Sequence, residues 1–367
     1  MHIVFDVRSY GQAYGGLSRY VAELASEMAA IGDDEVTLLA PIFSSPLFCN
    51  LAPVELAGRY VRPISRGIRL VAEINGILAR RWLRAIAPEV VHELFYYRKS
   101  GNPQKGRTVI TVYDMIDEKC ADSLGRNSSV RLRWDRSIKV DAIRRADHVI
   151  CISTSTRNDV LELLDMDLKQ VSVIHLGCRI PGQFAERRLI SEPYLLHVGN
   201  REGYKNFDLL FQAYANSARL RRNFRLVCFG GGSFSRDERS MIGASKLGGE
   251  SLVQLRGGDE ILRNLYTHAS ALIYPSLYEG FGLPALEAMA HGCPTVCSNT
   301  SSLPEVVGSA AELFDPHDVE AIVHAMERVV FSDARTVALR EAGRKRAEMF
   351  SWTACARKTR AIYEAIA

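Results

Sequence analysis

Short apolar segments with strand character alternate with helical segments along the chain, and this alternation constrains the fold more than any other feature. Parallel strands need a long crossover between them, usually a helix, so the pattern predicts parallel sheets with helices on both faces. It begins with MHIVFDVRS and restarts at YLLHVGN, which indicates two sheets. In the first half we expect strands near His2–Asp6, Val36–Ala40, Val90–His92, Val109–Val112, His148–Ile152 and Val171–Ile174.

The length of 367 residues also favours two domains, because a single hydrophobic core rarely grows that large. Three glycine or proline breaks and mixed charge between Leu176 and Pro193 mark a linker. We therefore predict an α/β fold with a Rossmann-like, doubly wound domain over 1–182 and a second one over 183–350.

Composition narrows the class of protein further. Hydrophobic residues make up 47% and charged residues 24%, as in soluble globular proteins, and a net charge of +4 is too small to indicate nucleic-acid binding. No apolar run approaches the roughly 18 residues that span a membrane, and the amino terminus has the pattern of a strand rather than a signal peptide. Eight cysteines without a C-x-x-C pair favour buried thiols over disulfides or zinc, so we expect a cytoplasmic protein.

One stretch, from Ala271 to Val307, combines the strongest chemical signals. Glu279 follows a predicted strand directly, at the sheet edge where open α/β folds bind ligands. Gly280 and Gly282 allow close approach of a ligand to the backbone, and Pro284 fits the start of a helix, whose amides favour an anion or sugar oxygens. Glu287 adds a second carboxylate one turn on. The alternative is an ordinary core helix flanked by two solvated carboxylates.

The order of these residues, Glu279, Gly280, Phe281, Gly282, Leu283 and then Glu287, resembles the Glu-x7-Glu motif of retaining glycosyltransferases of family 4 (GT4). The resemblance implies a GT-B fold, with a nucleotide sugar bound between two Rossmann-like domains and a last helix, 351–367, that returns to the first domain. It also implies that Glu279 contacts the donor sugar, that the amides of Phe281 to Leu283 contact its hydroxyls and phosphate, and that Glu287 contacts the ribose.

Two cations lie near the start of the second half, in the segment GNREGYKNFDLL. Arg201 and Lys205 are four residues apart between a strand and a helix, where two cations would neutralise a diphosphate. The segment resembles the G-x-R-x-x-x-K-N stretch of the same family, in which these residues do so. The alternative is a solvated Arg and Lys beside a helix start.

Further donor contacts are implied by the same resemblance. Gly230 closes a strand, and Asp259 stands at a strand-to-helix turn where it would accept from guanine; it is also suited to cap the helix that follows. Near the amino terminus, Gly15 and Gly16 open a helix that would approach the donor phosphate, with Arg19 toward the acceptor. These glycines do not have the G-x-G-x-x-G spacing of a dinucleotide fingerprint, which disfavours a dehydrogenase; an ordinary turn is the other interpretation.

The segment TVYDMIDE places Tyr113 and Asp114 at the end of a strand. Related enzymes often carry His-Asp here, lining the acceptor and sugar pocket, so Tyr113 departs from the pattern. A carboxylate at Asp114 would orient the acceptor hydroxyl or stabilise positive charge on the sugar ring. Alternatively, Asp114 only caps a turn.

No metal site is predicted, because the histidines are scattered and Asp165-Met-Asp167 has the pattern of a turn. Between Arg59 and Arg107, however, eleven Lys or Arg stand against three Glu. Within this stretch basic and apolar residues share helical spacing, which is typical either of a surface helix or of a face for anionic lipid or a lipid-phosphate acceptor.

These features together predict a retaining, metal-independent glycosyltransferase that needs no cofactor. We expect it to move a hexose, mannose from GDP-mannose in the first instance, to a hydroxyl of a glycan or lipid-linked acceptor in cell-surface polysaccharide assembly. The expected location is the cytoplasm or the inner face of the plasma membrane. The alternatives are a GT-B-shaped sugar-nucleotide epimerase or phosphorylase, and a nucleotide-binding protein without catalysis.

Overall fold

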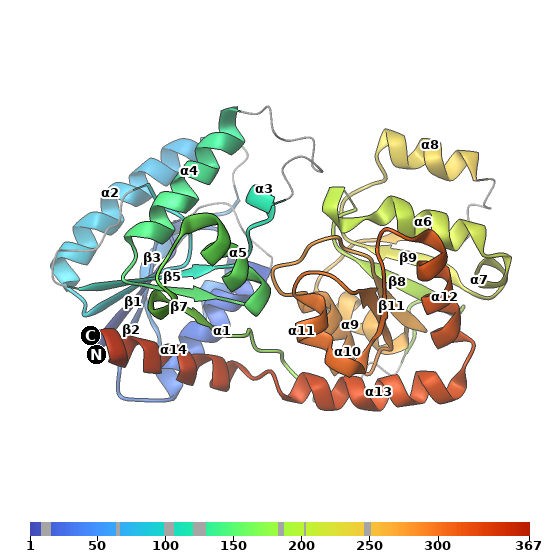
Figure 1. Cartoon of the computed structure of the whole chain (residues 1–367). Coiled ribbons are helices and arrows are strands. Elements are labelled where there is room, and N and C mark those ends of the chain that lie inside the picture. Colours follow the sequence, from blue (N-terminus) through green and yellow to red (C-terminus); the bar gives the residue numbers. More distant parts are fainter. Residues whose placement is uncertain are drawn as a thin grey trace. The chain divides into compact units, whose positions relative to one another are not determined.

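The computed structural model describes residues 1–8, 16–63, 67–98, 106–119, 130–182, 187–201, 203–245 and 251–367, with the side chains of 69 and 130–135 left out. These residues form two compact units (Figure 1). The first unit extends to Gly177 and also includes Ser351–Ala367, whereas the second comprises Cys178–Phe350. No described helix is both long enough and apolar enough to cross a bilayer.

The first unit is built on a seven-stranded parallel sheet in the order β3-β2-β1-β4-β5-β6-β7. Each strand expected from the sequence is present, with ends shifted by a few residues. The strands are β1 (His2–Asp6), β2 (Glu35–Phe43), β3 (Glu55–Tyr60), β4 (Val90–Glu93), β5 (Arg107–Val112), β6 (His148–Cys151) and β7 (Val171–Val173).

Strand β3 was not predicted, because ELAGRY lacks the apolar run of a buried strand. It lies at the edge of the sheet and its side chains are only partly buried. Its pairing with β2 depends on a glycine: a Cβ at Gly58 would lie 1.8 Å from the carbonyl oxygen of Ala40. Glycine usually weakens a strand, but here Gly58 allows β3 to pair closely with β2.

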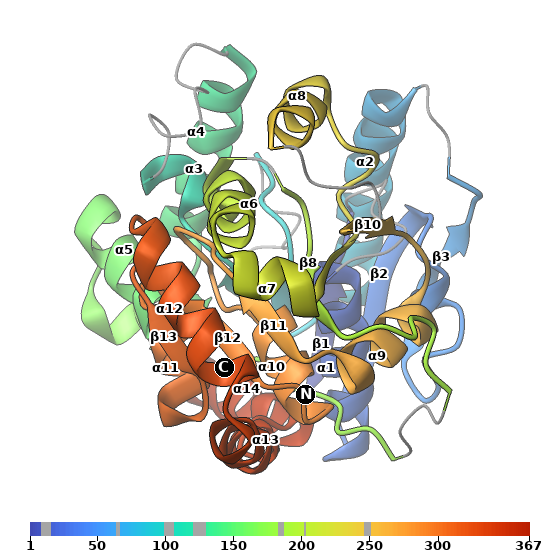
Figure 2. The ribbon, with the colours of Figure 1, turned by 90° about the vertical axis from the view of Figure 1, so that its right-hand side faces the viewer.

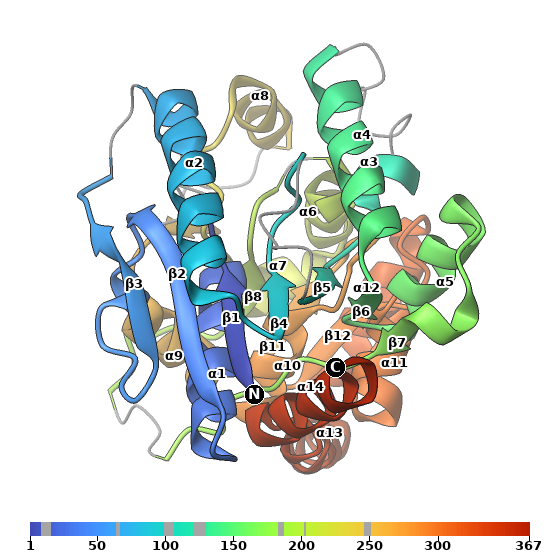
Figure 3. The ribbon, with the colours of Figure 1, turned by 90° about the vertical axis from the view of Figure 1, so that its left-hand side faces the viewer.

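Helices cover both faces of this sheet. Figure 3 shows α2 in front of β1 and β2, with α4 further along the sheet; α2 packs through Ala79 and Leu83 on Val4, Leu39 and Val91. Helix α5 begins at the predicted cap, since the Ser153 hydroxyl accepts from Thr156 N. The helices are α1 (Gly16–Ala30), α2 (Ile68–Ile86), α3 (Ile116–Lys119), α4 (Val130–Arg145), α5 (Thr154–Leu164) and α14 (Trp352–Ile366), with 3-10 turns at Pro46–Phe48 and Leu168–Gln170.

The last helix, α14, packs along α1 and contributes to the core of the first unit. The hydroxyl of Tyr363 pairs with Nδ1 of His92, whose Nε2 pairs with Thr111 Oγ1 at 2.7 Å. Burial lowers the pKa of His92 to about 3, so the ring is neutral at physiological pH. At the surface, Arg360 donates to Asp34 at 2.6 Å.

The second unit has a six-stranded parallel sheet in the order β10-β9-β8-β11-β12-β13 (Figure 2). Its strands are β8 (Tyr194–Val198), β9 (Arg225–Phe229), β10 (Leu252–Leu255), β11 (Ala271–Tyr274), β12 (Thr295–Ser298) and β13 (Glu312–Phe314). Its helices are α6 (Phe207–Asn216), α7 (Ala218–Asn223), α8 (Arg236–Ala244), α9 (Asp259–His268), α10 (Leu283–Ala290), α11 (Leu303–Val307), α12 (Val319–Val330) and α13 (Asp333–Glu348), with 3-10 turns at Gly203–Lys205 and Gly308–Ala310.

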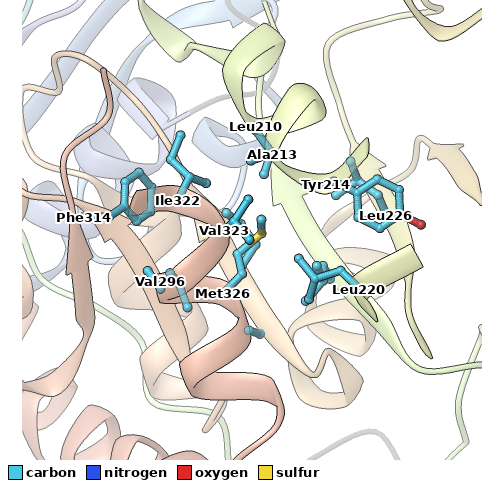
Figure 4. Close-up of a cluster of buried hydrophobic side chains, with 14 of the residues drawn as sticks. Leu210, Ala213, Tyr214, Leu220, Leu226, Val296, Phe314, Ile322, Val323 and Met326 are labelled. Atoms are coloured by element: carbon cyan, nitrogen blue, oxygen red, sulfur yellow. The ribbon is translucent and has the colours of Figure 1, made fainter. Parts of the chain in front are cut away.

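A large apolar cluster lies between this sheet and the helices α6, α7 and α12. Figure 4 shows Leu210 and Tyr214 of α6 near Leu220 of α7, with Met326 of α12 and Val296 of β12 beside them. Full burial of each such side chain stabilises the fold by about 1.5–3 kcal/mol. Helices α9 and α10 contact each other, and α10 also contacts β11 and β12.

In both sheets the strand order reverses once, between β1 and β4 in the first unit and between β8 and β11 in the second. The α/β fold with two doubly wound sheets is thus confirmed. At such a reversal the two loops that leave the carboxyl ends of the strands diverge, and ligands of open α/β sheets bind there. The predicted residues Lys205 and Glu279 follow β8 and β11, so they belong to the reversal of the second sheet.

Candidate active site

Lys205 and Glu279 meet at the reversal of the second sheet. Lys205 Nζ donates to Glu279 Oε1 at 2.6 Å and to the Tyr274 hydroxyl at 3.2 Å. Burial lowers the pKa of Lys205, but the neighbouring Tyr274 and Glu279 outweigh burial and hold this pKa well above its usual value. An ammonium group has three donors, so after these two partners one N–H of Lys205 is left for a ligand, as far as the described residues show.

Two serines fix the backbone of Glu279. Its N–H donates to Ser301 Oγ at 3.1 Å, and its carbonyl oxygen accepts from the hydroxyls of both Ser301 and Ser302. Ser301 has a positive φ of 55°, a conformation that a non-glycine residue adopts rarely. The loop after β12 thus holds the loop after β11, a contact that the sequence analysis did not predict.

The glycine-rich loop leads into helix α10 as predicted, although the helix begins at Leu283, one residue before Pro284. Gly282 has a φ of 98°, and a Cβ there would lie 2.6 Å from Leu303 Cδ2, so this position requires glycine. The side chain of Phe281 is buried against Phe350, with ring centroids 5.9 Å apart. The side chain of Phe281 therefore belongs to the core of the second unit.

Glu287 lies on α10 and accepts from the Tyr266 hydroxyl of α9 at 3.2 Å. Its carbonyl oxygen pairs with Nδ1 of His291 at 2.8 Å. The carboxylate is therefore held by a neighbouring helix, which differs from the solvated carboxylate of the alternative interpretation.

Arg201, which the sequence suggested as a cation for a diphosphate, forms hydrogen bonds within the chain. Its guanidinium donates to Glu238 at 2.6 Å and to the carbonyl oxygens of Gly230 at 2.9 Å, Gly231 at 3.3 Å and Gly232 at 3.0 Å. The three glycines all have positive φ, and the side chain of Arg201 is buried. Most of its five donors are thus used within the chain, and Arg201 shapes the glycine turn that contains Gly230.

Asp259 is the first residue of α9, whereas Gly258 takes the cap position and no side chain caps this helix. The expectation that Asp259 caps the helix is therefore wrong by one position. Its side chain is exposed, and contact with a nucleobase stays a prediction.

In the first unit, Tyr113 is held by its hydroxyl, which donates to the Leu94 carbonyl at 3.0 Å, and its ring meets Tyr20 edge-on. Burial raises the pKa of Tyr113 well above its usual value, so the hydroxyl stays protonated. Asp114 accepts from Ile116 N at 3.2 Å and lies 3.6 Å from Lys139 Nζ. The capping role is therefore present, beside a cation that the sequence analysis missed.

The predicted glycines and arginine near the amino terminus and the Asp165-Met-Asp167 segment lie away from the Lys205–Glu279 pair in sequence. Gly15 lies outside the described residues, Gly16 is the first residue of α1, and Arg19 is half-buried on that helix. Asp165 and Asp167 lie in a turn, where Asp167 accepts from Lys169 N at 2.9 Å. Among the residues described, no group of three or more His, Cys, Asp or Glu is placed to hold a metal ion.

Comparison with known families agrees with the two-unit division. The model for Glycosyltransferase Family 4 matches residues 14–180, and the model for Glycosyl transferases group 1 matches residues 183–346. The chain belongs to the GT4-type glycosyltransferases.

Its curated relatives include mannosyltransferases. This glycosyltransferase is 28% identical over 390 residues to O-antigen chain mannosyltransferase B of Escherichia coli, covering 99% of this chain and 100% of the relative. It is 27% identical over 382 residues to the GDP-mannose-dependent alpha-(1-6)-phosphatidylinositol dimannoside mannosyltransferase of Mycobacterium tuberculosis, covering 100% and 97%. Among solved structures, sucrose-phosphate synthase from Thermosynechococcus elongatus aligns with a TM-score of 0.77 at 20% identity, covering 99% of this chain and 98% of that one.

We predict that Arg201→Gln destabilises the second unit of this glycosyltransferase by about 3 kcal/mol, because it leaves the Glu238 carboxylate without its partner. Burial raises the pKa of Glu238, but the Arg201 hydrogen bond outweighs it and leaves this pKa below the ordinary 4.5. The contribution is therefore fully present above pH 4.5 and is lost as the pH falls through the lowered pKa. Urea unfolding at several pH values measures the difference.

Arg236→Gln is the matched control, since Arg236 is exposed on the same helix as Glu238. We expect it to change the free energy of unfolding by no more than about 0.5 kcal/mol. Equal stability of the Arg201 variant and the wild type at pH 7 would contradict the structural role of Arg201.

Proposed function

We propose that this glycosyltransferase transfers a hexose with retention of configuration, taking mannose from GDP-mannose and adding it to a hydroxyl of a glycan or lipid-linked acceptor. The observation that carries the proposal is the Lys205–Glu279 pair beside the start of α10, at the reversal of the second sheet. The printed names of the relatives support mannose as the sugar, and one of those names includes GDP-mannose. Assembly of a cell-surface polysaccharide is the corresponding role.

In the proposed reaction the acceptor oxygen attacks the anomeric carbon on the face from which the diphosphate leaves. A phosphate oxygen of the donor takes the acceptor proton as the glycosidic bond breaks, so no nucleophile of the enzyme is needed. The protein then contributes positioning and charge stabilisation.

Lys205 is the cation best placed for the leaving diphosphate, because one of its donors is not used by the described residues, whereas Arg201 is bound to Glu238 and the glycine turn. The amino-terminal end of α10 adds the positive end of a helix dipole. With these groups as counter-charges, the proposed reaction uses no metal ion. Glu279, fixed by Ser301 and Ser302, would accept hydrogen bonds from the hexose hydroxyls.

We expect Lys205→Ala and Glu279→Ala each to lower transfer by about 100-fold or more, comparable with the loss of an oxyanion-hole donor. Transfer is measured with radiolabelled GDP-mannose and a membrane lipid extract, after circular dichroism has shown that each variant is folded. Lys345→Ala, on α13, is the control and should leave the rate unchanged. Wild-type turnover by either folded variant counts against the proposal, and epimerised nucleotide sugar without transfer would favour an epimerase.

The donor base can be identified by thermal unfolding in the presence of GDP, UDP or ADP. We expect GDP to stabilise the protein most, since a ligand at 100 times its Kd adds about 2.7 kcal/mol. A larger effect of UDP or ADP would contradict the guanine donor, and no effect of any nucleotide would contradict a nucleotide-sugar enzyme.

Peripheral membrane contact through α2 is a further part of the proposal. Leu70 and Ile77 are each 61% exposed, and Arg81 and Arg84 are exposed on the same helix. Apolar side chains together with arginines favour an anionic bilayer surface. Sedimentation with phosphatidylglycerol vesicles tests this contact: Leu70→Glu should reduce the bound fraction, and equal binding of wild type and variant would refute it.

A further inference from the structure

A cavity of about 620 Å³ lies within the first unit, between α2 and the loop that follows β4. This volume is within the range of small-molecule sites. Its walls include Arg8, which follows β1, and Tyr97, which follows β4, so the cavity opens at the strand reversal of the first sheet. Except for Arg8, its lining residues come from the stretch 59–107, which the sequence indicated as a surface helix or as a face for anionic lipid or a lipid-phosphate acceptor.

Of the charged side chains that line the cavity, Arg8, Arg80 and Arg98 are cationic and Glu73 is anionic. Arg8 also pairs with two buried carboxylates, those of Asp6 and Glu93, so Arg80 and Arg98 supply most of the positive charge that a ligand would meet. Arg8 is fixed by Asp6, with Nη2 to Oδ2 at 2.6 Å, and its guanidinium lies 4.0 Å from the centre of the Tyr97 ring. Arg80 is half-buried. Guanidinium groups in such a setting bind phosphate oxygens with paired hydrogen bonds.

The walls of the cavity are held in place before any ligand binds. Asn75, fully buried on α2, donates to the carbonyl oxygens of Arg8 at 3.0 Å and Ile42 at 2.9 Å, and accepts from Ile42 N at 2.9 Å. On the opposite side, the Tyr97 hydroxyl accepts from Arg8 N at 2.7 Å. A binding site fixed in this way costs less conformational entropy when it is filled.

The aromatic and apolar residues that line the cavity are suited to a sugar ring, and one of them continues into an exposed apolar surface. Phe95, Tyr96 and Tyr97 contribute aromatic side chains, whose apolar faces can pack against a sugar. Ile77 lines the cavity and also belongs to the exposed apolar row of α2, with Ile74 one turn and Leu70 two turns before it.

We propose that this cavity binds a phosphate group carried on a sugar or cyclitol ring of the acceptor. The arginines take the phosphate, the aromatic side chains take the ring, and the row through Ile77 lies where a lipid chain attached to the phosphate would emerge. The inference rests on the proposed function only in naming the ligand as the acceptor, because binding to the cavity requires no donor nucleotide.

Isothermal titration calorimetry of the full chain with mannose 6-phosphate, without donor, tests the proposal. We expect saturable binding, and no comparable binding of methyl mannoside, which lacks the phosphate. Arg80→Gln should weaken binding about tenfold or more, the effect of losing a charge-assisted hydrogen bond. Gly76→Leu should weaken it without changing charge, because a Cβ at Gly76 meets only Arg80 Nη1, at 3.8 Å, and a larger side chain would extend into the cavity.

Arg144→Gln is the matched control, since Arg144 is exposed on α4 of the first unit and does not line the cavity. Mannose 6-phosphate affinity that is unchanged in both Arg80→Gln and Gly76→Leu would overturn the proposal, as would equal affinity for methyl mannoside. GDP titrations of the same variants separate the two hypotheses. If GDP binds and mannose 6-phosphate does not, only the cavity proposal is contradicted. If mannose 6-phosphate binds and GDP does not, only the proposal of a GDP-mannose donor is contradicted.

The same chemistry is present in a free sugar phosphate and in a phospholipid headgroup. Vesicles of phosphatidylcholine with or without phosphatidylinositol distinguish these sources. Displacement of mannose 6-phosphate by the phosphatidylinositol vesicles alone supports a lipid-linked acceptor. Binding that neither type of vesicle displaces supports a soluble one, and both results place the phosphate in the cavity.

Discussion

The largely buried Lys205 of the second unit stays charged because the Glu279 carboxylate lies 2.6 Å from its Nζ. The two residues are far apart in sequence, because Lys205 follows β8 and Glu279 follows β11. The reversal of strand order makes these two strands neighbours in the sheet and brings their loops together. The glycine loop and the start of α10 follow Glu279 directly, and the serines that hold its backbone come from the loop after β12. The position of the site is therefore a property of the topology, and its chemistry is a property of a few side chains.

Two cations with the same apparent purpose in the sequence have different surroundings in the structure. Lys205 retains a donor beyond those its described partners take, whereas Arg201 is bound to Glu238 and to three carbonyl oxygens of a glycine turn. Three consecutive glycines with positive φ expose their carbonyl groups on one side, and a planar guanidinium can satisfy several of them at once. The two cations therefore differ in how many of their donors are used within the described part of the chain.

The sequence predicted what depends on local pattern. Buried parallel strands are continuous apolar runs, so most strands could be located, and the Glu279 loop and the Ser153 cap have local signatures. The serines behind Glu279 and the amide of Asn75 could not be found in this way, because their partners are distant in the chain. The edge strand β3 was not predicted, because it contains Gly58 and has no apolar run. The cap of α9 was assigned to Asp259 instead of Gly258, because glycine has no side chain that would indicate a cap.

The closing helix α14 has a consequence for the order in which the protein forms. Tyr363 and Trp352 are buried in the first unit, where Tyr363 pairs with His92, although some 270 residues of chain separate that pair. Among the described residues, the second unit is made of a single stretch, 178–350. During synthesis the carboxyl-terminal sheet can therefore be complete while the amino-terminal one, translated first, still lacks helix α14, so the earlier core closes only after the second unit has been translated.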